Sequence, residues 1–157
     1  MDVIEPLSSK EKEIFLLSLQ EINKHIDFFI IRFYHYFLQT KAETLFRDTT
    51  FESQNKMFNT ILNVLITYIA DPTQLEDYLQ RLIKIHSNLS INSDHVDYVI
   101  SSFINSLNEI FNEEADVVII EIWTKVINEV MIHFKNGLQL EKLEEKRFHS
   151  FNRIYLE

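Results

Sequence analysis

Apolar residues recur at intervals of three and four along most of the chain, which is the spacing of amphipathic helices. Ser8 and Ser9, followed by Glu11, predict the start of a first helix. Apolar stripes predict a second helix over residues 26–37 and a short segment over residues 41–46, and the pattern leaves open whether the chain breaks between the first two helices. No stretch alternates with period two for long, so we expect no sheet.

The second half of the chain shows the same spacing, interrupted by helix stop and start signals. A long helix is predicted from Phe51, and Asp71 and Pro72 end it and begin the next one, with the proline in the first turn. Ser93 is expected to cap a further helix. After a break at residues 113–114, a last apolar stripe predicts the final long helix.

The length of 157 residues and the 46% hydrophobic content predict one all-α domain with a substantial core. We place this domain in residues 1–137 and a helical extension or tail in residues 138–157. Four apolar residues of this tail have helical spacing, namely Leu138, Leu140, Leu143 and Phe148. Two interpretations fit them: the tail contacts a partner or a second copy, or it is a frayed end.

Composition narrows the class of protein further. A single glycine and two prolines favour long helices with short connections, and the lack of cysteine excludes disulfides and thiolate metal sites and fits a reducing compartment. The net charge of −9 argues against a nucleic-acid partner. No segment is long and apolar enough to cross a bilayer, and the start MDVIEPLSSKEKE lacks the features of a secretory signal. We therefore expect a cytoplasmic protein without a membrane partner.

One polar residue, His86 in the stretch LQRLIKIHSNLSI, lies on the apolar side of its predicted helix. A neutral imidazole has one donor and one acceptor nitrogen, so its burial requires a partner for each. A backbone carbonyl of the preceding turn can serve one nitrogen, and a flat apolar cofactor with a metal at its centre would serve the other. Alternatively, His86 lies at the rim of the core, half in water. The six histidines form no known zinc motif, and the chain has no phosphate-binding glycine loop and no nucleophile elbow.

Several stretches resemble, in order, parts of the bacterial single-domain haem globins and of the globin domain of flavohaemoglobins. FYHYFL is similar to the end of the second globin helix, and AETLF to the short third helix. FESQNKMF is similar to the distal helix, and IWTKVINEV to the last helix. LQRLIKIHSNLSINSDHVDYV is similar to the proximal-histidine helix, the loop after it and the start of the next helix. The resemblance covers about residues 8–136 and implies the globin fold, a three-on-three helical sandwich.

The resemblance also implies a haem site. His86 would be the metal ligand, binding the iron of haem b (iron protoporphyrin IX), and Phe46 would stack on the porphyrin edge. Gln54 would be the distal polar residue, with Phe58 one turn later. Tyr34 would donate a hydrogen bond to bound gas.

Other positions of the implied site have alternatives. Phe33 or Tyr36 could take the place of Tyr34, because the chain between the second and third helices is shorter than in flavohaemoglobins. The aliphatic residues that the resemblance places around the haem are Leu82, Ile91, Val96 and Ile100. An ordinary core would account for them equally well. Arg81 and Lys84 would neutralise the haem propionates or belong to the solvated surface.

Three functions are consistent with this resemblance. The favoured one is reversible binding of O2, NO or CO by a monomer or weak homodimer. The second is an enzyme, an NO dioxygenase or nitrite reductase that needs a separate reductase. Against it, Val96 and Leu138 stand about where flavohaemoglobins have a tyrosine and a glutamate that polarise the proximal histidine. The third is a haem-free globin-fold signalling module that binds another protein or a fatty acid.

Overall fold

The computed structural model describes residues 7–87, 89 and 91–155, with the side chains of 151, 152, 154 and 155 left out, and the described part is helical, without strands. The helices are α1 (Ser9–Lys24), α2 (Ile26–Phe37), α3 (Glu43–Phe46), α4 (Phe51–Ala70), α5 (Pro72–Ser87), α6 (Ser93–Ile110), the short 3-10 helix η1 (Glu114–Asp116) and α7 (Val117–Tyr155). The all-α prediction is confirmed. The structure does not describe residues 1–6, 88, 90, 156 and 157. Residues 1–6 include the beginning of the stretch MDVIEPLSSKEKE, in which we expect no secretory signal.

Local sequence signals set most of the helix ends. The side chain of Ser8 accepts a hydrogen bond from the backbone N–H of Glu11, whose carboxylate accepts one from the N–H of Ser8, so the two residues form a capping box. The chain breaks at His25, between α1 and α2, which settles the point that the hydrophobic pattern left open. Asp71 separates α4 from α5, and α5 begins at Pro72 as predicted.

The cap of α6 differs from the prediction by one residue. Asn92, not Ser93, accepts the hydrogen bond from the backbone N–H of His95, at 3.1 Å. The ring of His95 returns a second bond, since its Nδ1 accepts from the backbone N–H of Asn92 at 3.0 Å. An asparagine caps at least as well as a serine, and here the reciprocal bond from His95 fixes the choice.

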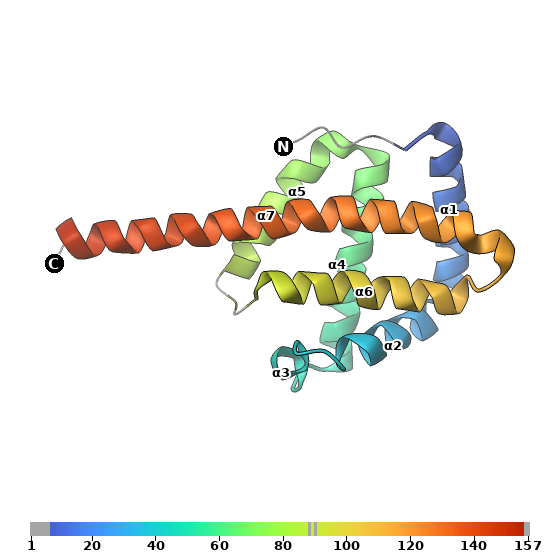
Figure 1. Ribbon diagram of the computed structural model, residues 1–157, viewed down its shortest axis with the longest axis horizontal. Coiled ribbons are helices and arrows are strands. Elements are labelled where there is room, and N and C mark those ends of the chain that lie inside the picture. The colour runs from blue at the N-terminus through green and yellow to red at the C-terminus, as the bar shows by residue number, and fades with distance from the viewer. Residues whose placement is uncertain (1–6, 88, 90, 156–157) are drawn as a thin grey trace.

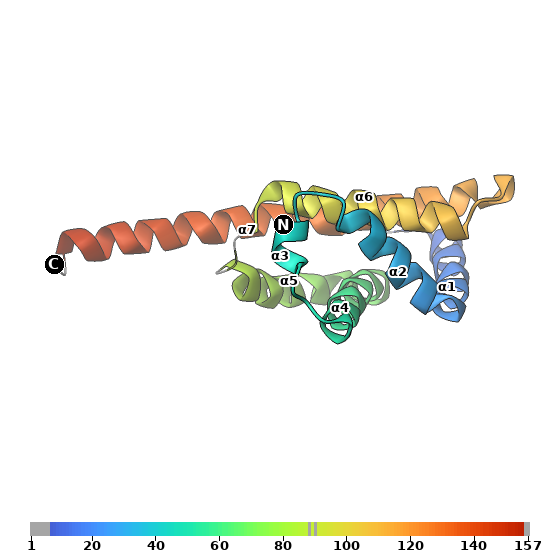
Figure 2. The same cartoon turned by 90° about the horizontal axis from the view of Figure 1, so that it is seen from below.

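The helices pack in two layers, with α1, α4 and α5 against α2, α6 and α7 (Figures 1 and 2). Helices α6 and α7 lie side by side, α2 packs against α6, and α4 packs against both α5 and α7. This is the expected three-on-three sandwich. The last helix is much longer than the others and extends well beyond the two layers (Figure 1).

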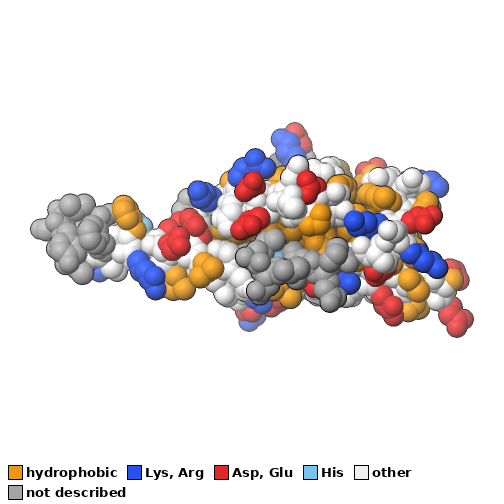
Figure 3. All heavy atoms as spheres, turned by 90° about the horizontal axis from the view of Figure 1, so that it is seen from above, with side chains coloured by type: hydrophobic (Ala, Val, Ile, Leu, Met, Phe, Trp, Pro, Cys, Tyr) orange, Lys and Arg blue, Asp and Glu red, His pale blue; other side chains and the backbone are white. Residues whose placement is uncertain are grey.

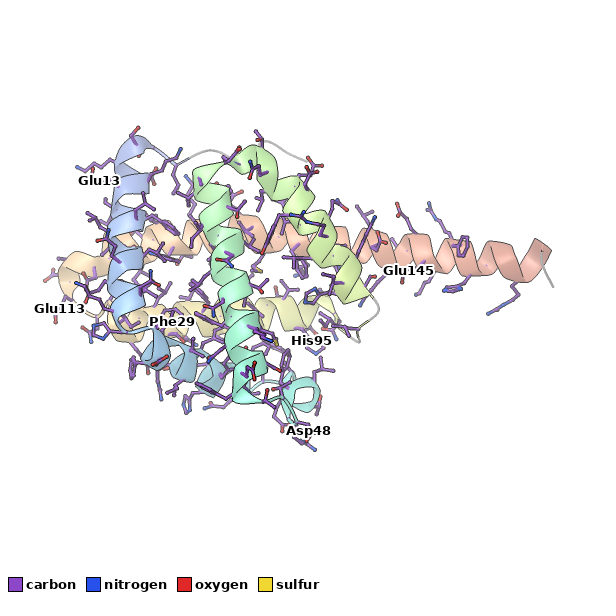
Figure 4. The ribbon with its side chains drawn as sticks, turned by 180° about the vertical axis from the view of Figure 1, so that it is seen from behind. Glu13, Phe29, Asp48, His95, Glu113 and Glu145 are labelled. Carbon is purple, nitrogen blue, oxygen red and sulfur yellow. The ribbon has the colours of Figure 1, made fainter. Side chains whose placement is uncertain are left out.

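Aromatic side chains fill the centre of the sandwich. Phe29 and Phe33 each contact Phe58 and Phe103, which also contact each other, with ring centroids 5.2 to 6.5 Å apart. Figure 4 shows Phe29 between its own helix and the crossing of α4 and α6. Trp123 is fully buried and stacks on Phe15, so it joins α7 to α1.

The segment that was predicted as a helical extension or tail lies in the last helix. Helix α7 continues through Gly137 without interruption to Tyr155. The four apolar residues of the tail do not share one environment, however. Leu138 is buried at 2% exposure, whereas Leu140, Leu143 and Phe148 are exposed. Leu138 is therefore part of the core of the helical domain and not of a free tail surface.

Candidate haem pocket

A cavity of about 330 Å³ lies between α4, α5 and α6, with α2, α3 and α7 closing it. Its size falls within the range of small-molecule and cofactor sites, which begins at about 300 Å³. The lining is almost entirely aromatic and aliphatic. The polar residues that line it are Tyr34, Thr60, His86 and His95. A pocket of this composition suits a large, flat, apolar ligand with a few polar groups.

The orientation of His86 is fixed by its own helix. Nδ1 of the ring lies 2.7 Å from the backbone carbonyl oxygen of Leu82, one turn earlier in α5. A carbonyl can only accept a hydrogen bond, so Nδ1 must carry the proton and donate it. In the neutral ring, Nε2 then has a free lone pair, and no described residue hydrogen-bonds to it. The ring also meets Phe134 of α7 edge to face, at 5.5 Å between centroids.

The opposite wall of the cavity comes from α4. Met57, Thr60, Ile61 and Val64 line it, at the spacing of three and four residues that places side chains on one helix face. None of these four was singled out as a site residue from the sequence. The spacing in the sequence predicts the helix but not which of its faces is turned toward His86.

Gln54 and Phe58, the residues expected on this wall, do not line the cavity. Gln54 lies in the first turn of α4, where its amide nitrogen donates to the hydroxyl of Thr49 at 3.2 Å. Phe58 is fully buried among the rings of α2 and α6. Each residue of a helix turns the side-chain direction by about 100°. Phe58 is therefore turned about 100° from Met57, toward the rings of α2 and α6. Gln54 lies two turns before Ile61 on nearly the same side of α4, but its amide is held by Thr49 at the start of the helix and it does not line the cavity.

Tyr34 lines the cavity from α2, and so does Phe33, while Tyr36 does not. The hydroxyl of Tyr34 donates to the backbone carbonyl oxygen of Gln54 at 2.9 Å. Burial raises the pKa of the Tyr34 phenol above its usual range, so the hydroxyl keeps its proton at neutral pH. Tyr36 instead donates to the carboxylate of Glu109 at 2.8 Å.

Most of the remaining expected residues reach the cavity. Phe46, Leu82, Ile91 and Val96 line it. Ile100 does not line it, and the residues of α6 that do are His95, Val96 and Val99. Arg81 and Lys84 are exposed and do not line it either, and the guanidinium of Arg81 lies over the ring of Tyr78.

His95 is a polar residue of the pocket that the sequence interpretation missed. It lies at the start of α6 (Figure 4). Its Nδ1 accepts a hydrogen bond, so in the neutral ring Nε2 carries the proton and is a donor. The signal in the sequence was its place three residues after the capping Asn92, which fixes the ring at the helix start.

A comparison with protein families agrees with this geometry. The globin family model matches residues 32–134, a stretch that contains the second half of α2, all of α3 to α6 and the first part of α7. No curated protein and no solved structure matches the chain. The match covers more than half of the chain, so this protein belongs to the globin family and its helical sandwich is the globin fold. Among the described residues, no helix is both long enough and apolar enough to span a membrane.

Proposed function

We propose that this globin binds haem b through His86 and reversibly binds dioxygen, NO or CO at the haem iron. The single observation that carries the proposal is the hydrogen bond of 2.7 Å from Nδ1 of His86 to the carbonyl of Leu82. It leaves Nε2 unprotonated on a ring that lines an apolar cavity. A neutral imidazole held by a backbone carbonyl is the usual form of a metal-ligating histidine.

The residues around the cavity fit a porphyrin. Phe46, Leu82, Ile91 and Val96 would contact its apolar faces and edges. Thr60 and His95 supply hydroxyl and imidazole groups of the kind that can bind the propionates. When bound, haem supplies the iron centre at which a diatomic gas is held.

The surroundings of His86 favour reversible binding over NO dioxygenation or nitrite reduction. Its Nδ1 proton is held by a neutral carbonyl and not by a carboxylate, so the imidazole gains little anionic character. Val96 and Leu138, which stand where a polarising relay was considered, are both buried hydrocarbon. Turnover would in addition require a separate reductase.

The resemblance to bacterial single-domain globins supports a bacterial, cytoplasmic carrier or sensor of gas. The cysteine-free sequence agrees with a reducing compartment. Such a role needs only the gas and, for any redox cycle, a reductase as partners.

Absorption spectra of the recombinant chain titrated with haem test the proposal. Wild type should take up one haem per chain and give a ferrous spectrum that changes on adding CO. His86→Ala should lose this spectrum, and added imidazole should restore it by entering the space left by the side chain. His133→Ala is the matched control, because this half-buried histidine of α7 does not line the cavity.

Two results would contradict the proposal. The first is a His86→Ala protein that keeps the wild-type haem content and ferrous spectrum, which would show that another residue holds the iron. The second is a folded wild type that stays colourless after haem titration. That result would favour a haem-free globin-fold module that binds another protein or a fatty acid.

A further inference from the structure

The part of α7 that extends beyond the sandwich has two different faces. On the inner face, Leu138 is buried, Lys142 donates to the backbone carbonyl of Ile91, and Glu145 accepts a hydrogen bond from the hydroxyl of Ser87 at 3.1 Å. Leu138, Lys142 and Glu145 are four and three residues apart, so they share one side of the helix. This side holds α7 against the end of α5 and the segment before α6, and Figure 4 shows Glu145 at that place.

On the outer face, apolar and charged side chains are exposed, and no described part of the chain covers them. Leu140, Leu143 and Phe148 are 62%, 53% and 63% exposed. Glu144 and Arg147 are exposed between them and, among the described residues, take part in no ion pair. These five residues follow one another at helical spacing on the side opposite Leu138. We call them the outer stripe. Figure 3 shows apolar side chains next to charged ones along this projecting helix.

Beyond Glu145 the helix has no support from the other described residues. All side chains from 146 to 150 are exposed. An isolated helical segment of about ten residues is marginal in water, because helices shorter than about 12–15 residues rarely hold without packing. A helix that continues to Tyr155 under these conditions is well suited to packing against another helix.

The order of the charged residues along the extension indicates which helix would pack against it. The residues before position 146 are mostly acidic, namely Glu141, Lys142, Glu144 and Glu145. The charged residues from 146 to 155 are basic, namely Lys146, Arg147 and Arg153. A second copy running in the opposite direction would therefore place its basic half beside the acidic half of the first. A parallel copy in the same register would place like charges beside each other.

We propose that α7 forms an antiparallel homodimer through the outer stripe, with the twofold axis between residues 145 and 146. In a symmetric pair, residue i of one copy meets residue j of the other and the reverse. This axis places Glu144 level with Arg147 of the second copy, near the centre of the seam. Leu143 and Phe148 lie about 140° apart around the helix, so they border the seam on its two sides. Two ion pairs then form at once, with apolar side chains on both sides of them.

The composition of the outer stripe disfavours two other occupants. A bilayer surface would bury Glu144 between Leu143 and Phe148, which costs free energy with no compensating partner. An unrelated protein would need apolar and charged residues in the order that complements the outer stripe, whereas a second copy of this chain already has them. The proposal does not depend on haem binding.

The test measures the mass of the full chain by sedimentation equilibrium over a range of concentrations. Wild type should be in monomer–dimer equilibrium. Glu144→Arg and Arg147→Glu should each weaken dimerisation by about tenfold or more, because each variant alone has like charges at both pairs. An equal mixture of the two variants should dimerise again, since the mixed dimer restores opposite charges. Glu76→Arg, the same change at an exposed site on α5, should dimerise like wild type.

Mixing separates pairing between copies from an ion pair within one helix, because only the former is restored between two different chains. Circular dichroism should show all variants folded. Leu143→Glu should weaken the dimer independently of the ion pairs. The proposal is overturned if wild type is monomeric throughout, including the case in which it floats with anionic phospholipid vesicles. It is also overturned if a dimer forms that the single variants leave unchanged, or if the mixture fails to dimerise.

Discussion

The buried hydrogen bond between α1 and α7 gives a prediction of stability that is independent of haem. The indole N–H of Trp123 donates to the hydroxyl of Ser18 at 2.7 Å, and this hydroxyl donates to the carbonyl of Phe15 at 2.7 Å. Trp123 is fully buried, so water cannot replace the lost partner. Ser18→Ala leaves the indole N–H unsatisfied, and such a group costs about 1–3 kcal/mol.

This cost translates into a measurable shift of the unfolding midpoint. For a chain of this length, each kcal/mol lowers the melting temperature by about 2–4 °C, so Ser18→Ala should melt about 2–12 °C below wild type. Urea unfolding of the haem-free protein, followed by far-ultraviolet circular dichroism, gives the free energy directly. The chain has a single tryptophan, so its fluorescence reports on the same site.

A double-mutant cycle identifies the cause of the loss. Trp123→Phe removes the N–H, and in that background Ser18→Ala has no indole donor to leave unsatisfied. The serine substitution should therefore cost substantially less than it does in wild type. An equal cost in both backgrounds would refute the reasoning, because the loss would then come from the serine alone.

Two further predictions concern other contacts between helices. Arg32 donates two hydrogen bonds to the carboxylate of Glu109, at 2.5 and 2.8 Å. This arginine lowers the pKa of the Glu109 carboxyl. The stabilisation by this pair is therefore complete above about pH 5 and is lost as the pH falls through the lowered pKa. Glu109→Gln should lower the urea midpoint at pH 7 and flatten its decline between about pH 5 and 3, whereas Glu76→Gln should leave both unchanged. Gly137→Ala should not give the gain of about 1 kcal/mol that alanine has over glycine inside a helix, because the new methyl carbon would overlap Cδ1 of the buried Ile83, which must shift. Thermal melts should show Gly137→Ala to be more stabilising when Ile83→Val removes that atom.

Helix positions could be read from the sequence because they depend on local rules. Capping by Ser8, the Asp71–Pro72 boundary and the regular apolar stripes each involve neighbours within a few residues. Side-chain direction at the pocket is less local. Gln54 and Met57 belong to the same predicted helix, and which of them lines the cavity depends on how α4 is rotated against α2 and α6. That rotation is set by Phe58 among the rings of Phe29, Phe33 and Phe103, which come from distant parts of the chain.

The two faces of α7 are a second case in which the sequence alone does not show what a side chain contacts. Helical spacing alone puts Leu138 and Leu140 on opposite sides of α7, because they are two residues apart, but only the packed structure shows which of the two sides is buried. Lys142 and Ser87 are far apart in sequence from the residues they contact. Such contacts depend on the relative placement of α5 and α7, which no single stretch of sequence contains.

The orientation of α4 about its own axis gives a prediction about gas binding. It tests which residues of α4 line the pocket and, at the same time, the proposed function. Met57 lines the cavity opposite α5 and carries no hydrogen-bond donor, whereas the amide of Gln54 is held by Thr49 outside it. Met57→Gln should place an amide donor beside the gas ligand and slow dioxygen dissociation by about two- to tenfold, the equivalent of one hydrogen bond of 0.5–1.5 kcal/mol. The complementary variant Gln54→Met removes an amide that does not reach the cavity, so its dissociation rate should match wild type. Stopped-flow measurements on both proteins loaded with haem compare the two positions directly. If Gln54→Met accelerates dissociation while Met57→Gln changes nothing, the face of α4 turned toward His86 is that of Gln54 and Phe58, even where His86 still binds the haem.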